Sequence, residues 1–153
     1  NIMQVAQETF ISSTMWTDRL GFIAANETLK KLKKHKIHKK ISSYGNIIKN
    51  GWIKNAKKHK IDISISGLET ILYLKFNYKN NSEIITFFTQ EMLKRGYLAG
   101  SQVATSYAYN KNIINNYLKE VDYVFSKIRI FLDKGKFPLK GEIKHSTFKR
   151  LTG

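Results

Sequence analysis

Hydrophobic residues recur at helical spacing in two stretches near the start of the chain. In the first, from Thr17 to about Lys40, polar residues separate the apolar positions, which are Leu20, Ile23, Ala24, Leu29, Leu32 and Ile37. The second runs from about Ser43 to His59 and begins with a residue whose hydroxyl is suited to capping a helix. The pattern therefore predicts two amphipathic helices, with Ser43 as the N-cap of the second.

The periodicity of the pattern changes to two after residue 60. Apolar and polar residues alternate from Ile61 to Ser66, and the segment from Thr70 to Tyr78 is rich in β-branched and aromatic residues. Gly67 lies between these two stretches. We therefore expect two strands joined by a short turn, and a further strand from Val103 to Tyr109.

Two more helices follow from capping signals and apolar spacing. Residues Asn81-Ser82-Glu83 offer a cap and a first-turn acid to a helix that Gly96 closes. Asn110 precedes the most regular apolar stripe of the chain, which continues to Gly135. The remaining residues, Lys136 to Gly153, show little periodicity, and we expect them to lie as an extended arm.

The order of these elements predicts an α+β fold. It consists of a small, largely antiparallel sheet with helices packed on one face, preceded by a long amphipathic helix. We expect residues 41–153 to form a small α+β domain and residues 1–40 to precede it as a separate segment. The chain has no initiator Met, and the apolar segment from Ile2 to Ile11 has no partner upstream, so we expect a longer protein.

Composition adds a strong positive charge. The chain of 153 residues has 27 basic and 11 acidic residues, a net charge of +16. This charge raises the possibility of a nucleic-acid or anionic-surface binding module without catalysis. The densest run, Lys30 to Lys40, has no aromatic residue for base stacking and no Arg for bidentate base contacts. We interpret it as a solvated helix face and keep the binding module as the alternative function.

Several classes of chemistry are excluded or disfavoured by the residues present. With no Cys, the chain has no disulfides, thiolate zinc sites or iron–sulfur clusters. No apolar run is long enough to cross a bilayer, and we expect a cytoplasmic protein without a membrane partner. His35 and His38 are one helical turn apart, but no third ligand is close in sequence, so we expect no metal site. No phosphate-binding loop, nucleophile elbow or dinucleotide fingerprint occurs.

Two segments remain as candidate ligand contacts. Gly96 and Gly100 bracket a short loop that either approaches a ligand or only ends a helix and starts a strand. Residues 9–21 place hydroxyls and backbone N–H groups just before the first long helix, where an anion is favourable. The simpler interpretation of the second segment is helix capping by Ser13 or Thr17.

Residues 10–21, Phe-Ile-Ser-Ser-Thr-Met-Trp-Thr-Asp-Arg-Leu-Gly, closely resemble a segment of class III pyridoxal-phosphate (PLP) aminotransferases. The resemblance is to the branch similar to glutamate-1-semialdehyde aminomutase. Residues 88–99 look like that family's helix leading into its last strands, and residues 145–152 look like the C-terminal signature of its sugar-locus members. Because the three motifs occur in the family's order, the resemblance covers nearly the whole chain.

The resemblance implies that this chain is the C-terminal portion of a fold-type I PLP enzyme. The lysine that forms the Schiff base would lie upstream, so this segment would hold no catalytic residue and would be inactive alone. Residues 1–40 would be the cofactor-phosphate segment and a long connecting helix. The hydroxyl of Thr14 and the N–H of Ser13 would bind the cofactor phosphate of the neighbouring subunit, which implies a homodimer. Ser13 departs from the glycine of many class III enzymes.

A second departure concerns the substrate. Aminomutases carry a glutamate-containing loop after a Ser-Gln-like turn, whereas here Ser101-Gln102 runs into Val103-Ala104-Thr105-Ser106. The missing acid favours amino transfer between a small amino donor and a carbonyl substrate in another pathway, such as surface-sugar assembly, over tetrapyrrole synthesis. The segment would contribute part of the substrate pocket.

Overall fold

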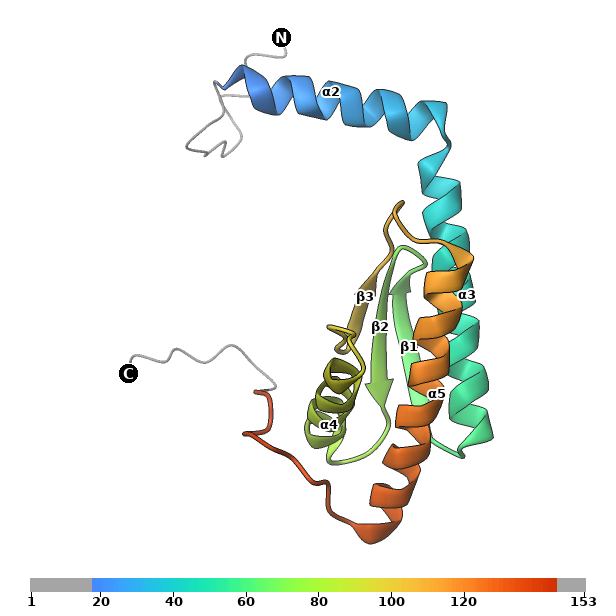
Figure 1. Ribbon diagram of the computed structural model, residues 1–153, viewed down its shortest axis with the longest axis vertical. Helices are drawn as coiled ribbons and strands as arrows, with labels where there is room; N and C mark the ends of the chain where they lie inside the picture. The colour runs from blue at the N-terminus through green and yellow to red at the C-terminus, as the bar shows by residue number, and fades with distance from the viewer. Residues whose placement is uncertain (1–17, 146–153) are drawn as a thin grey trace. The chain divides into compact units, whose positions relative to one another are not determined.

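The computed structural model describes residues 18–145 and comprises two compact units, residues 1–38 and 39–153. The described part contains four helices and three strands in the order helix, helix, strand, strand, helix, strand, helix (Figure 1). These elements are α2 (Arg19–Lys34), α3 (Ile37–Lys58), β1 (Ile63–Leu68), β2 (Ile71–Phe76), α4 (Asn81–Lys94), β3 (Gln102–Ala104) and α5 (Lys111–Lys134).

Helix α2 ends earlier than its apolar pattern predicts, and α3 begins earlier. The pattern placed the first helix up to Lys40, but α2 stops at Lys34 because Lys36 adopts a left-handed φ of 48°. The second helix therefore starts at Ile37, ahead of the expected cap at Ser43. The Ser43 hydroxyl donates to the carbonyl oxygen of Lys40, 2.7 Å away, as it does inside a helix. The prediction of Ser43 as an N-cap was wrong.

Helix α3 packs closely against the rest of the second unit. Its buried stripe consists of Tyr44, Gly45, Ile48, Trp52, Asn55 and Ala56. A Cβ atom on Gly45 would lie 1.5 Å from the carbonyl oxygen of Glu69, in the turn between β1 and β2. This position therefore requires glycine, because any side chain would collide with backbone.

The sheet is antiparallel throughout, with the strand order β1-β2-β3. One face is formed by Leu72, Leu74 and Phe76 of β2, which are at most 3% exposed. On the opposite face, Ile71 is 39% and Tyr73 is 46% exposed. The helices that follow α2 therefore cover one face of a small antiparallel sheet, which confirms that part of the predicted fold.

Strand β3 is shorter than predicted. It ends at Ala104, whereas the sequence pattern extended it to Tyr109. Beyond Ala104 the backbone turns, because the Ser106 carbonyl accepts from the N–H of Tyr109 and the Ser106 hydroxyl accepts from the N–H of Ala108. These local hydrogen bonds replace the sheet hydrogen bonds that a longer strand would need.

Helices α4 and α5 enclose an aromatic core with the sheet. The centroid of the Phe76 ring lies 5.6 Å from that of Phe125 in α5 and 6.3 Å from that of Phe88 in α4. The rings meet in edge and tilted arrangements, which aromatic pairs prefer. As predicted, the Asn110 side chain accepts from Ile113 N at 2.9 Å and Gly135 ends α5 with a φ of 71°.

The predicted start of α4 needs correction. Its N-cap position is Asn80, and the next residue, Asn81, uses its side chain to accept from the backbone N–H of Phe76. The amide oxygen of Asn81 therefore ties the end of β2 to α4 and does not cap the helix.

The residues after α5 lie against α4, although they form no regular element. Phe137 is 3% exposed and its ring lies 5.2 Å from that of Phe87. Gln90 of α4 donates to the Pro138 carbonyl and accepts from the N–H of Lys140. The extended arm expected from Lys136 is thus docked on α4 as far as Lys144, and residues 146–153 lie outside the described part.

Candidate functional site

The two residues predicted to bind the cofactor phosphate, Ser13 and Thr14, lie outside the described residues, as does Thr17. The start of α2 is described, and Asp18 is its N-cap: its carboxylate accepts from Leu20 N at 3.0 Å. A carboxylate at this position complements the helix dipole and repels a second anion. The N-terminus of α2 itself therefore does not fit a phosphate, and any such contact would belong to residues upstream of Asp18.

The two histidines considered as metal ligands do not belong to one helix. His35 follows α2, His38 lies in the first turn of α3, and the left-handed Lys36 separates them. The one-turn spacing therefore does not place them on one face of a single helix. Among residues 18–145, no group of three or more His, Asp or Glu side chains is close enough to hold a metal. In the same part of the chain, no helix combines the length and apolarity required to cross a membrane.

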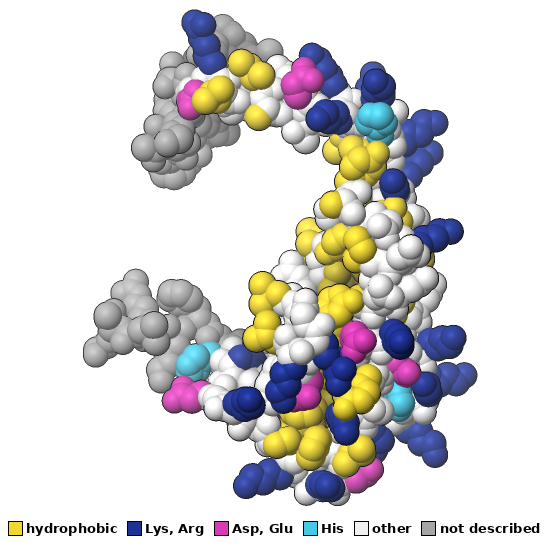
Figure 2. All heavy atoms as spheres, in the orientation of Figure 1, with side chains coloured by type: hydrophobic (Ala, Val, Ile, Leu, Met, Phe, Trp, Pro, Cys, Tyr) yellow, Lys and Arg dark blue, Asp and Glu magenta, His cyan; other side chains and the backbone are white. Residues whose placement is uncertain are grey.

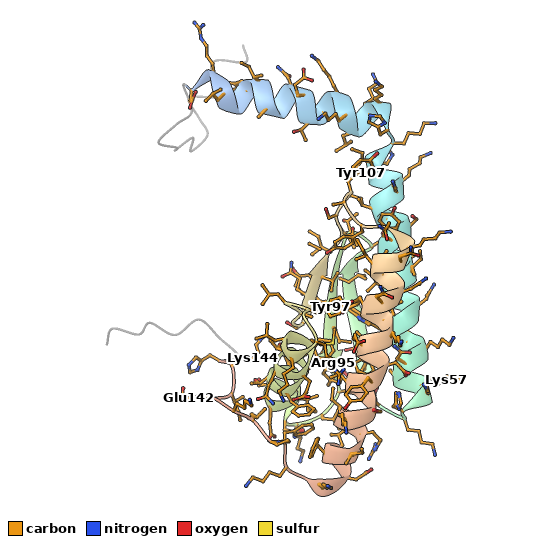
Figure 3. All side chains as sticks on the ribbon, in the orientation of Figure 1. Lys57, Arg95, Tyr97, Tyr107, Glu142 and Lys144 are labelled. Atoms are coloured by element: carbon orange, nitrogen blue, oxygen red, sulfur yellow. The ribbon has the colours of Figure 1, made fainter. Side chains whose placement is uncertain are left out.

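The second unit contains a cavity of about 290 Å³ between α3, α5 and the segment leading into β3. It is lined by Ile48, Tyr97, Leu98, Ala99, Gln102, Val103, Ala104, Tyr109, Ile113, Ile114 and Tyr117. Tyr97 is labelled in Figure 3, beside α5. Gly96 ends α4 with a φ of 82°, and the residues that follow it form part of the cavity wall. The loop from Gly96 to Gly100 thus both ends a helix and borders a cavity.

Three tyrosines and the Gln102 amide are the polar side chains of this cavity wall. Trp52 Nε1 donates to the Tyr117 hydroxyl oxygen at 3.1 Å, and the ring of Tyr97 lies edge-on to Tyr117 with centroids 5.8 Å apart. The Tyr109 hydroxyl donates to the Ala104 carbonyl at 3.3 Å. Burial raises the pKa of Tyr117 well above its usual value, although the hydrogen bond from Trp52 opposes this effect. Tyr117 is therefore a neutral hydrogen-bonding group and not a base.

A charged cluster joins α3 to α5 outside this cavity. Asp122 accepts from Lys58 Nζ at 2.6 Å, and its other oxygen lies 2.7 Å from His59 Nε2. Partial burial raises the pKa of Asp122, but the hydrogen bonds from Lys58 and His59 outweigh it and hold the pKa below its usual value. No sequence motif pointed to this cluster, because its members are 63 and 64 residues apart.

A second charged cluster joins the end of α4 to α5. Arg95 Nη1 donates to Glu120 Oε2 at 3.0 Å, and the Arg95 guanidinium carbon lies 3.6 Å from the centroid of the Tyr123 ring. Both charges of this pair are matched, and the guanidinium stacks on an aromatic face. We assign both clusters to holding helices together, since neither borders the cavity.

An open groove of about 560 Å³ runs between α4 and residues 140–144. Its charged side chains are mainly lysines, and Lys144 and Glu142 are labelled in Figure 3. Lys94 is paired with Glu91, and the backbone N–H of Lys144 donates to the Thr86 hydroxyl. The groove is the seam along which the C-terminal segment docks on α4.

No protein-family profile matches the chain, and no curated protein matches it. The chain does match a solved structure, the PLP internal aldimine form of the FumI protein of Sphingopyxis sp. MTA144, with a TM-score of 0.73 and 17% sequence identity. The match covers 86% of this chain and 32% of that one, so the chain spans about a third of the FumI length. At this identity the likeness is one of fold. The chain therefore has the fold of part of a protein whose structure was solved with PLP as an internal aldimine.

Proposed function

We propose that this chain is the C-terminal segment of a PLP-dependent enzyme, specifically a class III aminotransferase similar to glutamate-1-semialdehyde aminomutase. The observation that carries the proposal is the fold it shares with FumI over 86% of its length. The finer assignment is supported by the three motifs at residues 10–21, 88–99 and 145–152. The complete enzyme would transfer an amino group from a small amino donor to a carbonyl substrate.

In this proposal the chain supplies a phosphate contact to its dimer partner. Thr14 donates through its hydroxyl and Ser13 through its backbone N–H, while Asp18 sets the start of α2 without touching the phosphate. PLP, when bound, supplies the electron sink for the chemistry, and the protein orients it. Because the Schiff-base lysine lies upstream, this segment is inactive alone. Because the phosphate contact reaches the neighbouring subunit, the active enzyme is a homodimer.

The test of the proposal uses the complete protein that contains this segment. After purification with added PLP, it should show the absorbance of an internal aldimine, and borohydride should fix the cofactor to a lysine upstream of Asn1, as read by mass spectrometry. Absence of both signals would refute the enzymatic assignment. The isolated 153-residue chain should give neither signal, since it lacks that lysine.

The phosphate contact is tested separately by Thr14→Val in the complete protein. This change nearly keeps the side-chain shape and removes one charge-assisted hydrogen bond, so PLP affinity should fall about tenfold. The matched control is Thr28→Val in α2, whose hydroxyl donates only to the Ala24 carbonyl; it should leave PLP affinity unchanged. Reduced thermal stability with unchanged affinity in Thr14→Val would show that Thr14 has only a structural role.

One observation favours a second candidate function, polyanion binding. Helix α3 contains six lysines and no acidic residue, and Figure 2 shows basic side chains over this helix. Counterion release would make binding to DNA fall steeply with salt. Titration of labelled DNA at physiological salt tests it: a Kd within the non-specific range of about 10⁻⁴ to 10⁻⁶ M contradicts a dedicated site.

A further inference from the structure

The cavity between α3, α5 and β3 has no charged side chain on its wall, in a chain with a net charge of +16. An ion placed there would lose its hydration without gaining a partner of opposite charge, which is costly. Phosphates, carboxylates and ammonium groups are therefore poor occupants. The wall selects for an uncharged molecule.

The size of the cavity defines the kind of molecule it accepts. Its volume is about 290 Å³, whereas an apolar cavity of about 150 Å³ is sufficient for benzene. The interior wall is largely aliphatic and aromatic, with Ile48, Val103 and Ile114 contributed by α3, β3 and α5. A single ring with a short substituent fits this space.

The buried hydroxyl of Tyr117 at the cavity wall has a proton available for a hydrogen-bond acceptor. Tyr117 is 8% exposed, and its oxygen already accepts from Trp52. Within residues 18–145, the Tyr117 hydroxyl donates to no acceptor. A buried O–H gains free energy when an acceptor is supplied, since it cannot exchange freely with water. A ligand carbonyl or ether oxygen meets this need.

The rim of the cavity carries a large exposed apolar side chain. Leu98 is 92% exposed, and it lies in the loop between Gly96 and Gly100. An apolar ligand in the cavity would remove part of this side chain from water, which is favourable. The rim therefore adds an apolar contact to the uncharged wall and the free donor.

We propose that this cavity binds a neutral, mainly apolar molecule with one ring and one hydrogen-bond acceptor, which Tyr117 recognises by donating its hydroxyl proton. The inference goes beyond the proposed function, because it needs neither PLP nor the upstream part of the protein. All of its residues belong to the second unit.

The experiment titrates the 153-residue chain with three probes of similar shape, followed by NMR shifts of the Ile48 and Ile114 methyl groups. Acetophenone offers a ring and a carbonyl, cumene offers the same shape without an acceptor, and benzoate carries a charge. Acetophenone should bind saturably and about threefold to tenfold more tightly than cumene, the value of one neutral hydrogen bond. Benzoate should not bind.

Two variants locate the binding. Tyr117→Phe should make acetophenone bind as weakly as cumene, whereas Tyr73→Phe, on the exposed face of the sheet, should change nothing. Because Tyr117→Phe also leaves Trp52 without its acceptor, Ala99→Leu provides a second test: it fills the cavity and should abolish binding of both neutral probes. The proposal is overturned if acetophenone gives no saturable shifts, if benzoate binds equally well, or if Ala99→Leu leaves binding intact.

Discussion

Helices α2 and α5 have the same kind of sequence pattern and opposite burial. Both are amphipathic, and each begins at a side-chain cap, Asp18 for α2 and Asn110 for α5. None of the residues of α2 is buried, whereas α5 buries Ile114, Tyr117, Val121, Val124, Phe125 and Ile128. Figure 2 shows apolar side chains of α2 at its surface. An apolar stripe thus predicts a helix and the side it can bury, but not a partner within the same chain.

The difference in burial implies a difference in what stabilises each helix. Helix α5 contributes fully buried side chains to the core of the second unit, so its stability is that of the unit. Helix α2 buries none of its 16 residues, so it depends on its cap and on intrinsic propensity, whereas most helical stability in proteins comes from packing of an apolar face. We therefore expect α2 to unfold before the second unit.

The sharpest test of this contrast replaces one phenylalanine in each helix. Phe125→Ala removes a fully buried ring that contacts Phe76 and Phe88, and it should lower the free energy of unfolding by about 3–5 kcal/mol. Phe22→Ala, at a position 62% exposed, should change it by less than about 0.5 kcal/mol. Urea unfolding followed by circular dichroism measures both. Equal losses would show that α2 is packed in solution.

A glycine-to-alanine pair should give effects of opposite sign. Gly45→Ala puts a methyl group into the Glu69 carbonyl and should destabilise the second unit by about 3 kcal/mol, the upper end for overpacking. Gly21→Ala has no atom within 4 Å of the new Cβ and should stabilise α2 by roughly 0.5 kcal/mol through lower backbone entropy. Helix content and urea midpoints report the two effects. A neutral Gly45→Ala would contradict the close approach.

The next comparison is between an ion pair of the second unit and an ion pair of α2, measured by their contributions to the free energy of unfolding. The pKa of Asp122 is lowered in the folded chain, so its contribution is present above its unfolded pKa of about 3.9 and is lost as pH falls through the folded pKa. Asp122→Asn should lower the free energy of unfolding by about 1 kcal/mol at neutral pH. It should also make that free energy fall less steeply as the pH decreases below neutral. Glu27→Gln removes the exposed pair with Lys30 and should change neither quantity. An unchanged fall of that free energy with decreasing pH in Asp122→Asn would contradict this role.

The caps should give effects of about the same size as the Asp122 ion pair. Asp18→Ala and Asn110→Ala each remove one hydrogen bond to an N-terminal N–H, worth about 1 kcal/mol. Removing the Asp18 cap should speed amide exchange within α2 alone, whereas removing the Asn110 cap should lower the stability of the whole second unit. Residue-resolved hydrogen exchange distinguishes the two outcomes. Global destabilisation by Asp18→Ala would show that α2 folds cooperatively with the rest.

Order and type of the elements could be predicted from the chain, but several boundaries could not. The predicted ends of the first helix and of the third strand were wrong, because the hydrophobic pattern continues past the points where the backbone turns, at Lys36 and at Ser106. Phe137 was placed in an extended arm because a single aromatic after a glycine carries no periodicity. Its burial depends on Phe87, which is distant in sequence.

The candidate sites divide in the same way. Ser13 and Thr14 came from a contiguous motif and remain a prediction. The loop after Gly96 was recognised as a possible ligand contact, but the cavity behind it was not. Its wall combines residues from Ile48 to Tyr117, and no spacing rule connects positions so far apart.

Local chemistry along this chain accounts for the helices, the strands, the caps at Asn110 and Gly135, and the excess of positive charge, because each depends on a few neighbouring residues or on composition alone. Burial is different, since it depends on which distant surfaces meet. Folding alone decides that the stripe of α5 becomes core while that of α2 stays exposed, and that Tyr117 receives a hydrogen bond from Trp52 beside an uncharged cavity.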